Sequence, residues 1–147
     1  MPGYKGHLIG GAVAFAGLIL LIQASCKPAF FIALQYFFCT LLGALFPDID
    51  IKSRGQGLFY RVLVCVLLFL LIKKERTLYI CLSFIAVVPL LVRHRGLFHR
   101  MWFIVSIAAS SIMLCSYLDY PHMQHVVLCN LFFVTGAASH LFLDRVM

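Results

Sequence analysis

The sequence predicts an all-α bundle of transmembrane helices, and three observations lead to that prediction. The 147-residue chain is 63% hydrophobic and only 12% charged, so it lacks the polar surface that a water-soluble domain needs. Its mean hydropathy is correspondingly high, at +1.02. The apolar residues also fall into long runs with short connections, as expected when one helix after another crosses a bilayer.

Six apolar runs can be recognised, and we expect each of them to form a helix. They cover residues 8–24, 29–46, 58–72, 77–92, 101–118 and 125–143. Because the ~30 Å hydrocarbon core takes roughly 20 helical residues to cross, about six helices fill this chain. We therefore expect one integral-membrane domain, residues 1–147. The third and fourth runs are short for a full span, so four spans with two re-entrant segments is the alternative layout.

Alternation of six crossings would bring most His and Asp residues to one membrane face. That face receives His7, the turn Pro47-Asp48-Ile49-Asp50, the turn from His94 to His99, and His140 with Asp144. The opposite face receives only Glu75, Asp119, His122 and His125. Ionisable residues at the margin of an apolar bundle are costly to keep, so such a gathering predicts a functional site.

Small residues near these helix ends indicate how the polar groups are drawn together. His140 and Asp144 are four residues apart on one helical face, and Gly136 lies one turn before them. His7, just before the first run, shares a helix face with Gly10. In the second run Gly43 lies one turn ahead of Pro47, which follows that run. Small side chains let neighbouring backbones approach closely.

The two polar turns also have simpler interpretations. The Asp48-Ile49-Asp50 segment after Pro47 can be a solvated turn with a capping carboxylate. His94 and His99 are five apart, so Gly96 must bend the chain if both imidazoles are to reach one point. Taken singly, either histidine suits an interfacial position, and that is the role we expect for His122 and His125.

The combination of residues nevertheless predicts a metal site. The six cysteines are scattered without a C-x-x-C pair, which leaves imidazole nitrogen and carboxylate oxygen as the ligands. These suit Zn²⁺ first, with Mn²⁺ or Fe²⁺ as alternatives, and there are enough for one or two ions. The predicted ligands are His7, Asp48, Asp50, His94, His99, His140 and Asp144.

Arginines beside this cluster predict an anionic substrate. The guanidinium groups of Arg54, Arg93, Arg95 and Arg100 match phosphate oxygens. The expected partners are therefore membrane lipid and a phosphate-bearing substrate, and not nucleic acid. Lysine and arginine are also more frequent on the His and Asp face, which the positive-inside rule assigns to the cytoplasm.

Four motifs in order carry a resemblance to a known family. They are G-H-L-I-G-G near the start, P-D-I-D after the second run, H-R-G-L-F-H midway, and S-H-L-F-L-D near the C-terminus. Together they resemble the YdjM-type family of bacterial inner-membrane proteins, which are predicted membrane-bound metal-dependent hydrolases. The resemblance implies that the seven ligands form the metal-binding and catalytic set. Phe98 departs from the pattern, in which a small hydroxyl residue precedes the second histidine of the central motif.

The leading expectation is a hydrolase of a phosphoester or diphosphate on a lipid or other amphiphile, with metal-activated water as the nucleophile. Its expected catalytic residues are Asp48, Asp50, His99 and Asp144. One alternative is a metal or proton transporter, although the middles of the runs carry no ionisable residue. The other is a non-enzymatic scaffold whose metal site ties helix ends together.

Overall fold

The computed structural model describes residues 3–23, 27–49, 53–76, 79–80, 82–83, 87 and 96–146. Throughout this part of the chain the regular structure is helical. Its elements are α1 (Tyr4–Gln23), α2 (Phe30–Leu45), the short 3-10 helix η1 (Phe46–Asp48), α3 (Arg54–Ile72), α5 (Met101–Tyr117) and α6 (Met123–Val146).

The helical fold class is confirmed, and five of the six predicted helices lie in the described part of the chain. The fourth run, residues 77–92, lies mostly outside it, although its few described residues are helical. Four apolar helices in the described residues are long enough to cross a membrane: Tyr4–Gln23, Phe30–Asp48, Arg54–Ile72 and Met123–Val146. The fifth apolar helix, α5, is shorter, with 17 residues.

The third run makes a longer helix than its apolar residues predicted. α3 begins at Arg54, because Ser53 caps it: the Ser53 hydroxyl oxygen accepts a hydrogen bond of 3.0 Å from the backbone N–H of Gln56. The added first turn is polar and brings the helix to 19 residues. The expectation that this run is short for a span is therefore wrong.

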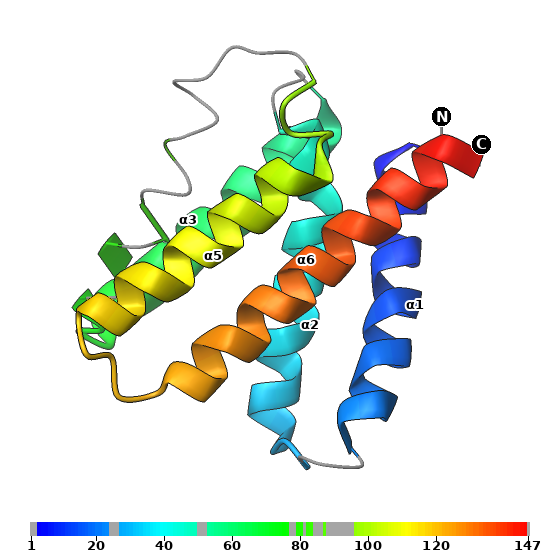
Figure 1. The fold of residues 1–147 in the computed structure, drawn as a ribbon. Helices are drawn as coiled ribbons and strands as arrows, with labels where there is room; N and C mark the ends of the chain where they lie inside the picture. The colour runs from blue at the N-terminus through cyan, green and yellow to red at the C-terminus, as the bar shows by residue number, and fades with distance from the viewer. Residues whose placement is uncertain are drawn as a thin grey trace.

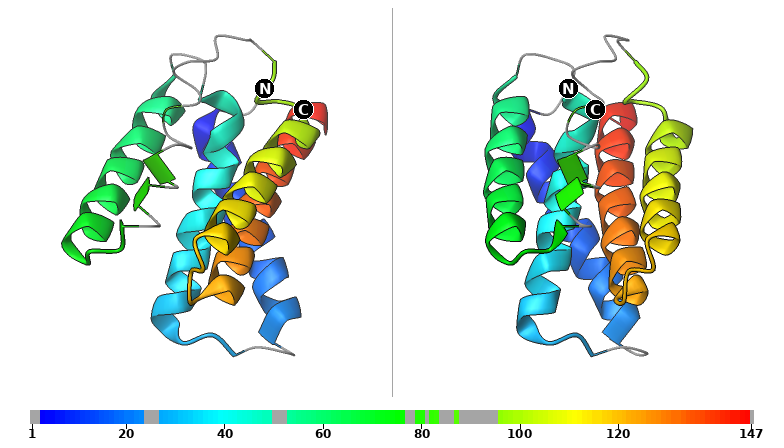
Figure 2. Two further views of the ribbon diagram at one scale, coloured as in Figure 1. Left: turned by 60° about the vertical axis from the view of Figure 1, so that its left-hand side comes forward. Right: turned by 90° about the vertical axis from the view of Figure 1, so that its left-hand side faces the viewer.

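α6 occupies the centre of the bundle, in contact with α1, α2 and α5. α3 adjoins α2 and η1. The chain runs up and down between two ends, and both termini lie at the same end of the molecule (Figures 1 and 2). The start of α1, the end of α2 and the end of α6 consequently meet there.

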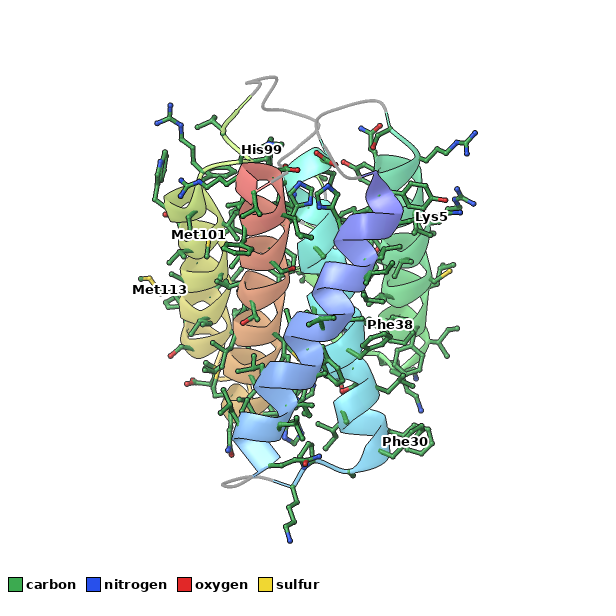
Figure 3. All side chains as sticks on the ribbon, turned by 90° about the vertical axis from the view of Figure 1, so that its right-hand side faces the viewer. Lys5, Phe30, Phe38, His99, Met101 and Met113 are labelled. Atoms are coloured by element: carbon green, nitrogen blue, oxygen red, sulfur yellow. The ribbon has the colours of Figure 1, made fainter. Side chains whose placement is uncertain are left out.

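Large apolar side chains cover the outside of the bundle, as Figure 3 shows for Phe30, Phe38 and Met113. Leu21 and Ile72 are more than 70% exposed, at 75% and 78%. A soluble protein seldom exposes apolar surface on this scale, whereas hydrocarbon solvates it readily. The outer surface of the bundle is therefore its lipid-facing surface.

α2 and α6 cross with their backbones in contact. A Cβ atom added at Gly43 would overlap the carbonyl oxygen of Phe133, and one added at Gly136 would overlap the carbonyl oxygen of Thr40. Only glycine permits so close an approach at these two positions. The crossing brings the C-terminal end of α2 directly against the last two turns of α6.

Candidate metal centre

Five of the seven predicted ligands come together at the end of the bundle that holds both termini. His7 lies in the first turns of α1, Asp48 ends η1, and His99 lies in the turn before α5 (Figure 3). His140 and Asp144 lie on α6. Asp50 and His94 fall outside the described residues.

Imidazole nitrogens and carboxylate oxygens alternate around this cluster. His140 Nε2 lies 3.1 Å from Asp144 Oδ2 and 3.6 Å from Asp48 Oδ1. His99 Nε2 lies 3.6 Å from that same Asp48 oxygen and 3.7 Å from that same Asp144 oxygen. Each oxygen thus lies between two nitrogens, and the four atoms form a ring. His7 Nε2 approaches the other oxygen of Asp144, Oδ1, at 3.6 Å.

The spacing of these atoms fits ligands around a divalent cation. Imidazole nitrogen and carboxylate oxygen lie about 2.0–2.2 Å from zinc, which puts adjacent ligands about 3.0–3.5 Å apart. The ring distances of 3.1–3.7 Å are close to that range. His140 Nε2 is fully buried and has no hydrogen-bond partner within the described part of the chain. A cation at the centre of the ring would satisfy this nitrogen and the two carboxylates together.

A backbone carbonyl of α2 sets the tautomer of His140. His140 Nδ1 lies 2.7 Å from the carbonyl oxygen of Ala44, which can only accept a hydrogen bond, so Nδ1 carries the proton and donates it. In the neutral ring, the lone pair is then on Nε2, which faces the two aspartates. Metal-binding histidines commonly have this arrangement. It depends on the close crossing of α2 and α6.

Stacking between two imidazoles fixes the orientation of His7. The rings of His7 and His140 have centroids 3.6 Å apart and planes inclined by 14°. Both side chains are buried. The two rings are therefore held by packing, which reduces the entropy lost when they bind an ion.

Two groups of three residues bring ligand atoms within 4.8 Å of one another. One contains His7, His140 and Asp144, and the other contains Asp48, His99 and His140. His140 belongs to both, but its single free lone pair can bind only one ion. Asp144 can serve two positions, because its two oxygens face different histidines. The cluster thus offers two overlapping groups of three candidate ligands, each of which would leave one position of a four-coordinate ion open.

The site is buried on one side and accessible on the other. The side chains of His99 and Asp48 are 29% and 27% exposed, whereas those of Asp144 and His140 are 12% and 0% exposed. Water and a polar substrate group can therefore approach from the side of His99 and Asp48.

The family model described as YdjM inner membrane protein matches residues 1–147, the full chain. The chain belongs to the YdjM family of inner membrane proteins. This confirms the resemblance seen in the four motifs, and membership agrees with the several apolar helices. Comparison with curated proteins and with solved structures gives no match.

Phe98, the residue immediately before His99, has a packing role. Its side chain is fully buried, and its ring makes edge-to-face contacts with Phe46 and Phe103 at 5.6 and 5.2 Å. Phe46 immediately precedes the Pro47-Asp48 segment. In this member of the family, the residue before His99 therefore anchors the ligand-bearing turn to the apolar core.

Only two of the four predicted substrate-binding arginines can be placed. Arg54 begins α3 and Arg100 precedes α5, and both are exposed beside ligand-bearing segments. Arg93 and Arg95 lie outside the described residues. Arg100 is exposed and directly follows His99 in the chain.

Sequence reasoning missed the carbonyl of Ala44 and the contacts of His125. A backbone acceptor has no sequence signal except the small residues that allow the helices to approach. His125, expected as an interfacial residue, lies on α6, where its Nδ1 is 3.3 Å from the buried Tyr36 hydroxyl. Its Nε2 is 3.5 Å from Cys129 Sγ. The four-residue spacing of His125 and Cys129 was the available signal.

Proposed function

We propose that this YdjM-family protein is a metal-dependent hydrolase that cleaves a phosphoester or diphosphate on a lipid or other amphiphile. The observation that carries the proposal is the ring formed by His99, His140, Asp48 and Asp144, which three separate segments supply and which is accessible on one side. Unrelated surface residues from three segments are not expected to place their nitrogen and oxygen atoms in such a ring.

The five clustered residues would hold one or two divalent ions, Zn²⁺ first and Mn²⁺ or Fe²⁺ as alternatives. When bound, such an ion supplies a Lewis acid that polarises a phosphoryl oxygen and lowers the pKa of water toward ~7. Asp48 suits the role of general base, because it is partly exposed and can accept the proton of an attacking water. Its neighbour His99 would stabilise the negative charge on the phosphoryl oxygens as the water attacks.

Arg100 and Arg54 would bind the anionic group of the substrate. Both are exposed, at the start of α3 and just before α5, so we expect their guanidinium groups to be available to a phosphate at the membrane surface. Arg93, Arg95, Asp50 and His94 remain candidates from the sequence for the same site.

The accessible side of the cluster argues for catalysis and against a purely structural site. A structural site has every coordination position filled by protein and is closed, whereas His99 and Asp48 are each more than a quarter exposed. A transport path would need ionisable groups at the bilayer midplane. The middles of α1, α2 and α6 carry none.

The test measures metal content and hydrolysis on the same detergent-purified protein. Loaded with Zn²⁺ or Mn²⁺, the wild type should hydrolyse a member of a panel of lipid phosphoesters and diphosphates. Asp48→Asn should lower the rate at least about 100-fold, as loss of a general base does. His122→Ala is the control, because His122 is exposed and lies just before the start of α6, at the opposite end of that helix from His140 and Asp144. Stoichiometric metal without hydrolysis of any member of the panel would overturn the proposal.

A further inference from the structure

A second feature adjoins the cluster: an apolar groove of about 520 Å³ between α1 and α6. Small residues of both helices form its floor, and Ile9, Val13 and Phe142, each more than 60% exposed, form its outer edge. Figure 3 looks toward this side of the molecule, with α1 in front. The groove opens on the lipid-facing surface.

The groove is hollow because bulky side chains are missing where the two helices face each other. Gly10 lies against the end of the Leu143 side chain, so that a Cβ at Gly10 would come within 2.5 Å of Leu143 Cδ1. Ala14 continues the floor one turn along α1, and Ser139 faces them from α6. Elsewhere on the lipid-facing side of α1 large side chains such as Leu20 and Leu21 protrude.

One end of the groove lies next to the helix turns that carry His7 and Asp144. Gly6 lines the groove and precedes His7, and Leu143 lines it and precedes Asp144. His7 Nε2 and Asp144 Oδ1, 3.6 Å apart, join the same two helices at that end. A molecule in the groove would therefore have one end beside the ligands and the rest in hydrocarbon.

The dimensions of the groove match a lipid chain. From Gly6 to Ala14 the helix rises about 12 Å, and one leaflet supplies about half of the ~30 Å hydrocarbon core. We propose that the groove binds one acyl chain of a phosphate-bearing lipid, which enters sideways from the surrounding leaflet and places its head group at the metal centre. This inference rests on the proposed function and assigns its substrate class to lipids with a long chain.

Ala14 and Val13 would then determine which chains are accepted. They line the groove about two turns from His7, so a larger side chain there shortens the groove without touching a metal ligand. Ala14→Phe blocks the floor. Val13→Trp narrows the groove from its exposed edge, where the change leaves the contact between helices intact. Ala16→Phe is the matched control, because Ala16 is an exposed alanine of α1 outside the groove.

The experiment uses the full-length protein in lipid nanodiscs that contain phosphatidic acid with a photoactivatable group in its acyl chain. Cross-links should concentrate on residues 9–14 and 139–143 of the wild type and of Ala16→Phe. The yield of these cross-links should fall at least about tenfold in Ala14→Phe and Val13→Trp, as expected when several methylene groups of the acyl chain can no longer enter the groove. Metal content, measured in parallel, should stay unchanged in all four proteins.

Activity gives the second arm of the experiment. Hydrolysis of a long-chain phosphomonoester should fall at least about tenfold in Ala14→Phe, while that of a water-soluble short-chain ester stays at the wild-type level. Cross-links spread evenly over the lipid-facing surface, with long-chain hydrolysis unchanged in Ala14→Phe, would contradict binding of the chain in the groove. The proposed hydrolase activity would stand. Cross-links confined to the groove, in a protein that hydrolyses none of the substrates, would contradict the proposed hydrolase activity. Binding of the acyl chain in the groove would stand.

Discussion

His140 is the most constrained of the five clustered side chains. It is fully buried, its ring stacks on that of His7, and its Nδ1 is hydrogen-bonded to the carbonyl of Ala44. The orientation of its Nε2 is therefore fixed. It also belongs to both groups of candidate ligands. By contrast, the side chain of His99 is partly exposed. Burial thus separates His140, which would hold an ion in place, from His99 and Asp48, which would face the substrate in the function that we propose.

A first prediction follows from this difference. His140→Ala should lower metal affinity by more than about 100-fold, beyond the roughly 10–100-fold that loss of a residue supporting a ligand costs. His7→Ala removes a ligand from only one group, so it should reduce bound metal partially. Metal analysis after dialysis against a weak chelator measures both variants. Full metal content in a correctly folded His140→Ala protein would contradict the assignment.

A second prediction concerns Gln56, which supports the segment that holds Asp48. Its side-chain Nε2 donates a 2.7 Å hydrogen bond to the carbonyl of Ile49, the residue after Asp48. Gln56→Ala should loosen this turn and weaken metal binding about 10-fold or more, as outer contacts do in metal sites. Gln35→Ala, at an exposed position on α2, is the control. Equal metal affinity of the two variants would show that Gln56 has no positioning role.

At the scale of the helices, the crossing of α2 and α6 connects packing to the site. Gly43 and Gly136 bring the two backbones into contact, and one turn beyond Gly136 the carbonyl of Ala44 meets His140. Any side chain inserted at the crossing must therefore shift the hydrogen bond that sets the histidine tautomer. Stability and metal binding should change together here.

The third prediction tests this connection with Gly136→Ala. The added Cβ would overlap the carbonyl oxygen of Thr40, and such overpacking typically costs about 1–3 kcal/mol. We expect a lower unfolding temperature in detergent together with weaker metal binding. In Gly17→Ala the new Cβ meets nothing within 4 Å, so the higher helix propensity of alanine should leave this control as stable as the wild type or slightly more stable. A Gly136→Ala protein that behaves like this control would refute the close crossing.

The helices and the gathering of polar residues were predictable for a simple reason. Length and apolarity predict which runs form helices, and the parity of the six predicted crossings places His7, Asp48, His99 and His140 at one end, where the structure brings these four residues together. Neighbour relations were not predictable, because helices that are apolar all round show no face that marks a partner. The contact of His140 with Ala44 and that of His125 with Tyr36 both depend on such neighbours. The start of α3 was missed because Ser53 is a local cap within a polar segment.

At the scale of the whole molecule, the distribution of positive charge between the two ends bears on the orientation of the protein in the membrane. Lys5, Arg54, Arg100 and Arg145 lie at or next to the helix ends that hold the candidate metal centre. The opposite end has Lys27, Lys73, Lys74 and Arg76. With Arg61, which lies nearer the first end of α3, the described residues place five cations at the metal-centre end against four at the other. Arg93, Arg95 and Lys52 add to the first group if the six crossings predicted from the sequence hold.

The fourth prediction tests that orientation directly. If the metal centre faces the cytoplasm, green fluorescent protein fused after Val146 should fluoresce, and alkaline phosphatase fused there should be inactive. Alkaline phosphatase fused in the connection that contains Lys27, or in the one that contains Pro121, should be active, because both connections lie at the opposite end. The reverse pattern would place the site on the periplasmic side, and its substrate would then come from the outer leaflet. The lipid groove would keep its role in either orientation, because it opens to the leaflet on the same side as His7 and Asp144.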